Sequence, residues 1–188
     1  MPPKAKITRD MVIAAGFDIV RSEGQESLNV RRIASKLECS TQPIMYHYKT
    51  VDELKADIYA AADAFHTEYI MHPNANAAPL LYIGLNYVRF AHEEKHLYRF
   101  LFQSDKFRNI GLGDLLNGDE SAFLLEPLVR QAGLTLEQAK TVFETLFICV
   151  HGYASLLANN PMEYNEKRCA ELLTNTFMSI VGFVKRGE

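Results

Sequence analysis

Hydrophobic residues recur at helical spacing along most of the chain, and no segment shows the alternation that is typical of a β-strand. The spacing predicts a first helix that opens at Thr8 and runs to Glu23. Two much shorter helices are predicted next, over Val30–Leu37 and about Thr41–His47. The pattern therefore predicts an all-α protein whose N-terminal part contains two short consecutive helices.

The segment from Ser27 to Leu54 is dense in helix-start residues. Asn29, Ser40 and Thr50 each offer a side-chain oxygen to the backbone N–H groups that lack partners at the start of a helix. Thr50 also forms a T-x-x-E capping box with Glu53. Short helices joined by a tight polar turn predict a helix-turn-helix.

The remainder of the chain is predicted to be helical as well. A fourth helix keeps one face apolar from Thr50 to Tyr69, and HPNANAAP at 72–79 has the composition of a linker. The Gly-, Asp- and Asn-rich stretch 104–121 is predicted to be a loop. The later predicted helices bring the total to about nine: Leu80–Glu93, Lys95–Phe102, about Ala122–Gln131, Thr135–Ala158, and a last helix whose start is marked by Asn160, Pro161 and Glu163 and which ends at Lys185.

Charge is distributed unevenly along the chain. Residues 1–51 hold eight Lys or Arg against five acidic residues, which gives +3, so the rest must carry −6 to reach the net charge of −3. A basic N-terminal part on an acidic body is typical of a protein that contacts phosphate at one end. The absence of a signal-peptide pattern and of an apolar run of about eighteen residues predicts a cytoplasmic protein that does not contact a membrane. Cys39, Cys149 and Cys169 are widely spaced and predict free thiols.

The second short helix carries side chains that suit DNA. Thr41 and Gln42 can address base edges, while Tyr46, His47 and Lys49 can reach phosphates. The preceding helix has Val30, Ile33, Ala34 and Leu37 on its apolar face, and Arg31, Arg32 and Lys36 on the opposite face. This part of the chain is therefore predicted to bind double-stranded DNA.

The last two predicted helices have more apolar surface than one small bundle can bury. Within Thr135–Ala158, the stretch TVFETLFICVHGYASLLA contains Glu144 and no Lys or Arg, so nearly every face is apolar and needs a cover. A second copy of the chain is the simplest cover, and Gly152 permits close approach of helices. We therefore predict a homodimer; the alternative is that both helices belong to the core of one chain.

About 55 N-terminal residues resemble the TetR family of transcriptional regulators. The resemblance rests on the segments MVIAAGFDIVRSEG, SLNVRRIASKLECST and IMYHYKTVDEL. The matching positions are the paired Ala14 and Ala15, Gly24, Ile33 with Ala34, and the Tyr46, His47 and Tyr48 sequence. The chain departs from the family pattern at Glu38, where Gly is usual in the turn, at Met45, where Tyr is frequent, and at Val51, where Lys is usual.

The resemblance implies an all-α fold with a helix-turn-helix DNA-binding domain at 1–50, a connecting helix at 51–71, and a ligand-binding and dimerisation domain at 72–188. It implies a repressor that a small-molecule effector releases from a palindromic operator. By resemblance Arg31 and Gln42 meet base edges, and most of the other contacts are to phosphates. The complete predicted DNA-binding set is Asn29, Arg31, Arg32, Thr41, Gln42, Tyr46, His47 and Lys49.

An effector site is predicted in the C-terminal part only in general terms. Its candidate residues are Tyr82, Tyr87, Phe143, Phe147 and His151. His151 stands out because it is a polar ring on an almost entirely apolar helix, and a buried imidazole needs a partner. The alternative is that these side chains are ordinary core residues.

Catalysis is not expected, because the sequence has no Gly-rich phosphate loop and no nucleophile motif. His92 and His96 are spaced as neighbours on one helix face, so they could bind a metal ion together. No third ligand for such a site can be identified in the sequence. No cofactor is therefore predicted. The alternative function is a helical adaptor that acts through a protein partner and binds DNA weakly, as suggested by Glu38, Val51 and the acidic body.

Overall fold

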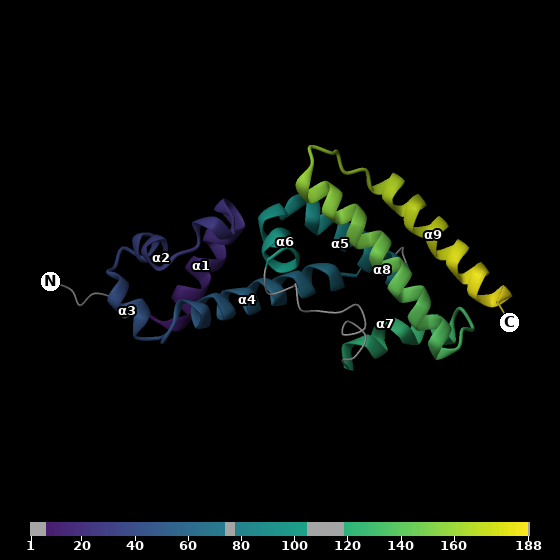
Figure 1. Ribbon diagram of the computed structural model, residues 1–188, viewed down its shortest axis with the longest axis horizontal. Coiled ribbons are helices and arrows are strands. Elements are labelled where there is room, and N and C mark those ends of the chain that lie inside the picture. Colours follow the sequence, from purple (N-terminus) through teal and green to yellow (C-terminus); the bar gives the residue numbers. More distant parts are fainter. Residues whose placement is uncertain (1–6, 74–77, 105–118, 188) are drawn as a thin grey trace. The chain divides into compact units, whose positions relative to one another are not determined.

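The structure is a computed structural model that describes residues 7–73, 78–104 and 119–187 (Figure 1). Over these ranges the chain forms nine α-helices and one short 3-10 helix, with no strand. The predicted all-α class and number of helices are confirmed. Most of the predicted loop at 104–121 lies outside the described residues.

The chain folds into two compact units. The N-terminal unit comprises Met1–Thr67 and Glu94–Lys106, and the C-terminal unit comprises Glu68–Glu93 and Phe107–Glu188. The division of functions at 50 and 71 stays a prediction. The units are described separately below.

The N-terminal unit is built around a core of aliphatic side chains. The side chains of Ile19, Ile33, Ile44 and Ile58 have almost no exposed surface. Gly16 allows α1 and α4 to approach closely, because a Cβ at this position would lie 2.3 Å from Cδ1 of Ile58. The helices of this unit are α1 (Arg9–Glu23), α2 (Val30–Lys36), α3 (Thr41–Met45), α4 (Val51–Met71), which continues beyond it, and α6 (Lys95–Phe102), with the 3-10 helix at Gln25–Ser27.

Most of the predicted helix starts are confirmed. Thr8 caps α1 by accepting from the Met11 N–H, and Asn29 caps α2 by accepting from the Arg32 N–H. Thr50 Oγ1 accepts from the backbone N–H of Glu53 at 3.1 Å. Ser40 occupies the cap position of α3, but its side chain makes no cap hydrogen bond, so that part of the prediction is wrong.

The turn between α2 and α3 holds a left-handed residue that is not glycine. Glu38 has φ 50°, the sole positive φ outside glycine in the described part of the chain. The Cys39 N–H donates to Ala34 O at 3.0 Å and the Glu38 N–H to Ser35 O at 3.2 Å. This pair of bonds is the Schellman motif, which requires a left-handed residue after the helix end. The sequence departure at Glu38 therefore leaves the turn intact and is accommodated as backbone strain.

Replacing Glu38 by Gly is expected to stabilise the protein. Glycine adopts the left-handed conformation without strain, although it loses more entropy on folding, so the net gain should be about 0.5–1 kcal/mol. Urea unfolding of the wild type and Glu38→Gly measures this difference. Glu38→Ala is the matched control and should give no comparable gain, because Ala keeps the Cβ. An equal effect of Ala and Gly would contradict the strain at this turn.

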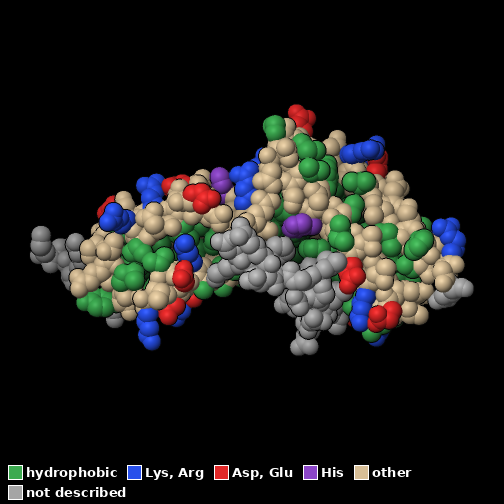
Figure 2. Space-filling model, in the orientation of Figure 1, with side chains coloured by type: hydrophobic (Ala, Val, Ile, Leu, Met, Phe, Trp, Pro, Cys, Tyr) green, Lys and Arg blue, Asp and Glu red, His purple; other side chains and the backbone are tan. Residues whose placement is uncertain are grey.

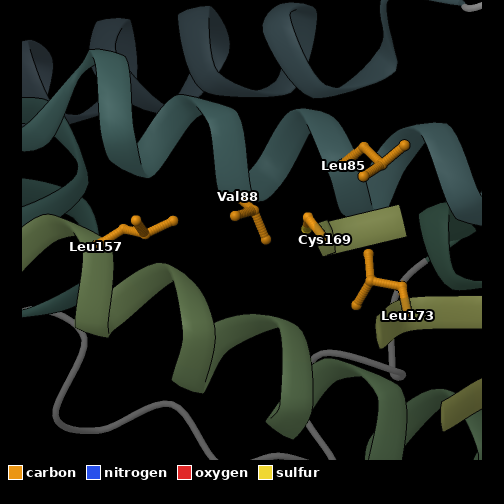
Figure 3. Packing of buried hydrophobic residues seen from close by; sticks show 5 residues of the cluster. All are labelled: Leu85, Val88, Leu157, Cys169 and Leu173. Carbon is orange, nitrogen blue, oxygen red and sulfur yellow. The ribbon is translucent and has the colours of Figure 1, made fainter. Parts of the chain in front are cut away.

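The C-terminal unit packs its helices around two clusters of buried apolar side chains. Figure 3 shows one cluster, in which Val88 of α5 lies between Leu157 of α8 and Cys169 of α9, and Leu85 of α5 lies on the side of Leu173 of α9. The other joins α7 to α8 and includes Leu128, Leu134 and Val142. The helices of this unit are α5 (Pro79–Glu93), α7 (Asp119–Arg130), α8 (Leu136–Asn159) and α9 (Glu166–Arg186).

The last helix begins later than predicted. Asn160 does not start α9; it ends α8, with its backbone N–H and its side-chain amide both donating to Leu156 O. Asn165 is the actual cap, because its Oδ1 accepts from the Arg168 N–H at 2.9 Å. Asn160 and Asn165 have the same capping chemistry, so the sequence alone does not decide between them. The residues between them form the connection in which the chain turns back so that α9 packs against α8.

Helix α8 is long and apolar enough to cross a membrane by length and composition, which corrects the expectation that no apolar run reaches this length. It is the sole helix of this kind among the described residues. Several of its side chains are buried against α5, α7 and α9, including Val142, Ala154 and Leu157. Within one chain, however, 22% of the most apolar 18-residue window of this helix is buried, so much of its surface has no cover from the other described helices.

Candidate functional site

Most of the side chains predicted to contact DNA are exposed on the N-terminal unit. They come from α2, from α3 and from the segment between α3 and α4. His47 is half-buried, whereas the others are exposed: Asn29, Arg31, Arg32, Thr41, Gln42, Tyr46 and Lys49. Contact with DNA remains a prediction for each of them.

Two of the three cations on α2 are engaged by acidic side chains of α1. Arg32 donates from Nε and Nη2 to the two carboxylate oxygens of Glu23, at 3.1 and 2.7 Å. This pairing raises the pKa of Arg32 and lowers the pKa of Glu23. Lys36 Nζ lies 3.4 Å from a carboxylate oxygen of Asp18. Arg31 is exposed, and no ion pair joins it to any residue that the structure describes, so it is the α2 cation best placed to meet a ligand.

Asn29 and His47 have structural contacts of their own. Besides capping α2, Asn29 donates from Nδ2 to Ser27 O at 3.2 Å. His47 Nε2 lies 2.9 Å from the Ile7 carbonyl oxygen, so this nitrogen carries the hydrogen and donates it. The segment that follows α3 is thereby tied to the residues just before α1. No local sequence pattern predicts this bond, because it joins residues forty positions apart.

A second tie joins α1, the segment after α3, and α4. Arg9 Nε and the Tyr48 hydroxyl both donate to the same oxygen of Asp57, at 2.7 and 2.9 Å. The Arg9 guanidinium also lies over the Tyr48 ring, 5.5 Å from its centroid. The Arg9 bond lowers the pKa of the Asp57 carboxyl, and burial together with the Asp57 bond raises the pKa of Tyr48 to about 12. This Arg9–Tyr48–Asp57 cluster holds the segment between α3 and α4 against α1 and α4.

The exposed face of α3 presents an amide and a phenol in contact with each other. Gln42 Nε2 donates to the Tyr46 hydroxyl at 3.1 Å, and the Tyr46 side chain is 78% exposed. Lys49, three positions after Tyr46, is exposed as well, while its backbone N–H donates to the Glu53 carboxylate at 2.7 Å. These residues therefore offer hydrogen-bonding groups and a cation that can contact base edges and phosphates.

Four of the five predicted effector residues come together in the C-terminal unit. The rings of Phe143, Phe147 and His151 are stacked along α8, each 20° from the next, and Tyr87 Oη is 2.9 Å from His151 Nδ1. Burial lowers the pKa of His151, which favours the neutral ring. Tyr82 is half-buried and lies five positions before Tyr87 on α5, a spacing that places it on a different face of the helix.

Two further features bear on ligand sites. His92 lies at the end of α5 and is stacked on Tyr164, whereas His96 lies in α6 against Gly24, so the predicted pairing on one helix face is wrong. A shallow, mostly apolar groove of about 320 Å³ lies on the N-terminal unit, which sequence reasoning missed. Its lining residues are Asp10, Ile13, Ala14, Phe17, Ala61 and Phe65.

Comparison with protein families identifies the C-terminal part of the chain. The family described as tetracyclin repressor-like, C-terminal domain, matches residues 80–177, which is just over half of the chain. The chain belongs to the TetR family. This match and the N-terminal resemblance come from segments of the sequence that do not overlap. No curated protein matches the chain.

Membership of the TetR family defines the general role of the protein as a regulator. Regulators of the TetR family generally bind DNA as dimers and respond to small-molecule effectors, and the regulatory domain is non-enzymatic.

Proposed function

We propose that this TetR-family protein is a cytoplasmic, sequence-specific repressor that binds a palindromic operator as a homodimer and leaves it when a small molecule binds. The observation that carries the proposal is the set of exposed side chains on α2 and α3, in a chain whose C-terminal part matches the TetR regulatory domain. Arg31 and Gln42 are the candidates for base edges. Thr41, Tyr46 and Lys49 are the candidates for phosphates.

Exposed apolar side chains on α8 and α9 support dimerisation. Ile148 is 60%, Met178 64% and Phe183 71% exposed, although large apolar side chains are usually covered. Gly152 and Gly182 have open space beside them, so a second pair of helices can approach closely. In Figure 2, hydrophobic side chains reach the surface over the region of α8 and α9. A second copy that covers these side chains would place two recognition helices at a set spacing, as a palindromic site requires.

The stack on α8 supports a site for an apolar, aromatic effector. Phe143 and Phe147 offer ring faces, and the His151–Tyr87 pair offers polar atoms that can orient a ligand. A ligand inserted here would change the packing between α5 and α8. Coupling follows if that change alters the spacing of the two DNA-binding units, because the operator then matches one state better than the other.

Binding to DNA upstream of the protein's own gene tests the proposal. A labelled duplex from this region is titrated with the full-length protein at several salt concentrations. We expect a sequence-specific shift whose affinity falls steeply with salt, because phosphate contacts release counterions. A shift that unlabelled nonspecific DNA removes as readily as the unlabelled upstream duplex would contradict the proposal for this site.

Two substitutions are expected to separate base reading from phosphate binding. Lys49→Ala should weaken binding to all sequences alike and reduce the salt slope by about 1, because one phosphate contact is lost. Gln42→Ala should instead reduce the preference for the operator over altered sequences and leave the salt slope unchanged. Filter binding at four salt concentrations measures both quantities. The same change in slope and preference for both variants would show that the roles are wrongly divided.

A helical adaptor with weak DNA binding is the second candidate. The ion pairs of Arg32 with Glu23 and of Lys36 with Asp18 favour it, because they engage two cations that DNA would need. Retention on heparin distinguishes the two. A DNA-binding protein should elute at high salt and lose retention on Arg31→Ala, whereas an adaptor should elute early with or without the substitution.

A further inference from the structure

The Gln42–Tyr46 pair lies on the face of α3 that the proposed function turns toward DNA. The two residues are four positions apart, so their side chains extend from the same side of the helix. Gln42 is exposed, and Tyr46 keeps 78% of its surface exposed although its ring is large and apolar. The hydrogen bond of 3.1 Å from Gln42 Nε2 to the Tyr46 hydroxyl holds the amide against the phenol.

The bond leaves Gln42 with the groups that recognise adenine. A glutamine amide has two N–H hydrogens and a carbonyl oxygen, and Tyr46 takes one hydrogen. The other hydrogen and Oε1 still form a donor–acceptor pair. In the major groove adenine presents the complementary pair, an acceptor at N7 and a donor at N6, whereas guanine presents two acceptors.

The phenol can also determine which way the amide faces. A hydroxyl has one hydrogen, and a backbone phosphate accepts hydrogen bonds without donating any. When the Tyr46 hydroxyl donates to a phosphate, it can only accept from Gln42, so Nε2 must face Tyr46 and Oε1 must face away. Without the hydroxyl, the amide can turn over and offer its N–H groups to guanine as well.

We infer that Tyr46 is a positioning residue that, by linking a phosphate contact to the amide of Gln42, makes Gln42 selective for adenine. The inference rests on the proposed function, since it requires DNA in contact with α3. It assigns one A·T pair in each half-site to Gln42. It also gives Tyr46 a role in sequence specificity, whereas a contact with phosphate alone would be the same for every DNA sequence.

The test uses the full-length protein and a randomised duplex library. The wild-type protein is first used to select its preferred DNA site from the library. The base pair of this site at which Gln42→Ala shows no base preference is then identified. Affinities for duplexes with A, G, C or T at that position are then measured for wild type, Gln42→Ala, Tyr46→Phe and the double variant. Tyr46→Phe keeps the ring and removes the hydroxyl, and its thermal unfolding verifies that the fold is unchanged.

The expected result is a change in one ratio. Wild-type protein should prefer adenine over guanine by about tenfold or more, and Tyr46→Phe should reduce this preference at least about fivefold at that position alone. The preference of the double variant for adenine over guanine should be no smaller than that of Gln42→Ala, because the two residues act as a unit. A variant whose affinity falls equally for all four bases would show that Tyr46 only contacts phosphate, and would overturn the inference. Failure of the wild type to select any sequence would instead overturn the proposed function.

Discussion

A protein that carries Ile148→Glu and Phe183→Glu is expected to be a folded monomer that has lost most of its affinity for a palindromic operator. Both are exposed apolar side chains, Ile148 on α8 and Phe183 on α9, and each change occurs twice in a symmetric dimer. Burying a carboxylate in such an interface is strongly unfavourable, so the dissociation constant of the dimer should rise by at least about a thousandfold. The affinity for the operator should fall at least about a hundredfold as well, because each monomer then binds one half-site independently.

Analytical ultracentrifugation and operator titration check this expectation. Met162→Glu is the control, since Met162 is an exposed apolar residue in the connection between α8 and α9 and receives the same kind of substitution, with one added carboxylate against two. The control should remain a dimer. A double variant that is still dimeric at micromolar concentration would contradict the assignment of these side chains to the dimer interface.

Acid is expected to destabilise the protein through His66. This histidine is 6% exposed on α4, with its ring edge-on to Phe102 of α6. Burial lowers the pKa of His66 from 6.5 to about 4. As the pH falls below 6.5, the unfolded chain binds a proton at His66, whereas the folded chain binds it only near pH 4. The free energy of unfolding is therefore unaffected by His66 above pH 6.5 and decreases as the pH falls toward 4. The loss amounts to about 3 kcal/mol.

Urea unfolding at pH 7 and pH 4.5, at one protein concentration, measures this loss. His66→Leu removes the ionisable group and should make stability much less dependent on pH across this window. Burial also lowers the pKa of His151, so some dependence should remain. His72→Leu, at an exposed residue, should behave as wild type. If His66→Leu lost as much stability in acid as the wild type, another group would be responsible.

The order of the helices could be predicted from the sequence because it depends on local chemistry. Thr8, Asn29 and Thr50 each hydrogen-bond within three residues, so the signal and the contact lie in the same short segment. The start of α9 was missed because Asn160 and Asn165 have the same capping chemistry, and tertiary packing decides between them. The strain at Glu38 was predictable because the turn requires a left-handed residue.

The contacts of the candidate site depend on distant residues and could be predicted only in part. The exposure of Gln42 and Tyr46 follows from their place on α3. The engagement of Arg32 by Glu23, and of His47 by the Ile7 carbonyl, depends on how α1 packs on its neighbours, which periodicity does not specify. The exposed residues of the candidate site could therefore be predicted from the sequence, whereas the hydrogen bonds and ion pairs between distant residues could not.

The Arg9–Tyr48–Asp57 cluster has a consequence for how an effector could act. Because one carboxylate joins α1, the segment between α3 and α4, and α4 itself, these elements cannot shift against one another without breaking several bonds at once. An effector that tilts α4 would then carry each N-terminal unit along as a rigid body. The ligand-bound dimer would still read a single half-site correctly, and it would lose only the ability to occupy two half-sites together.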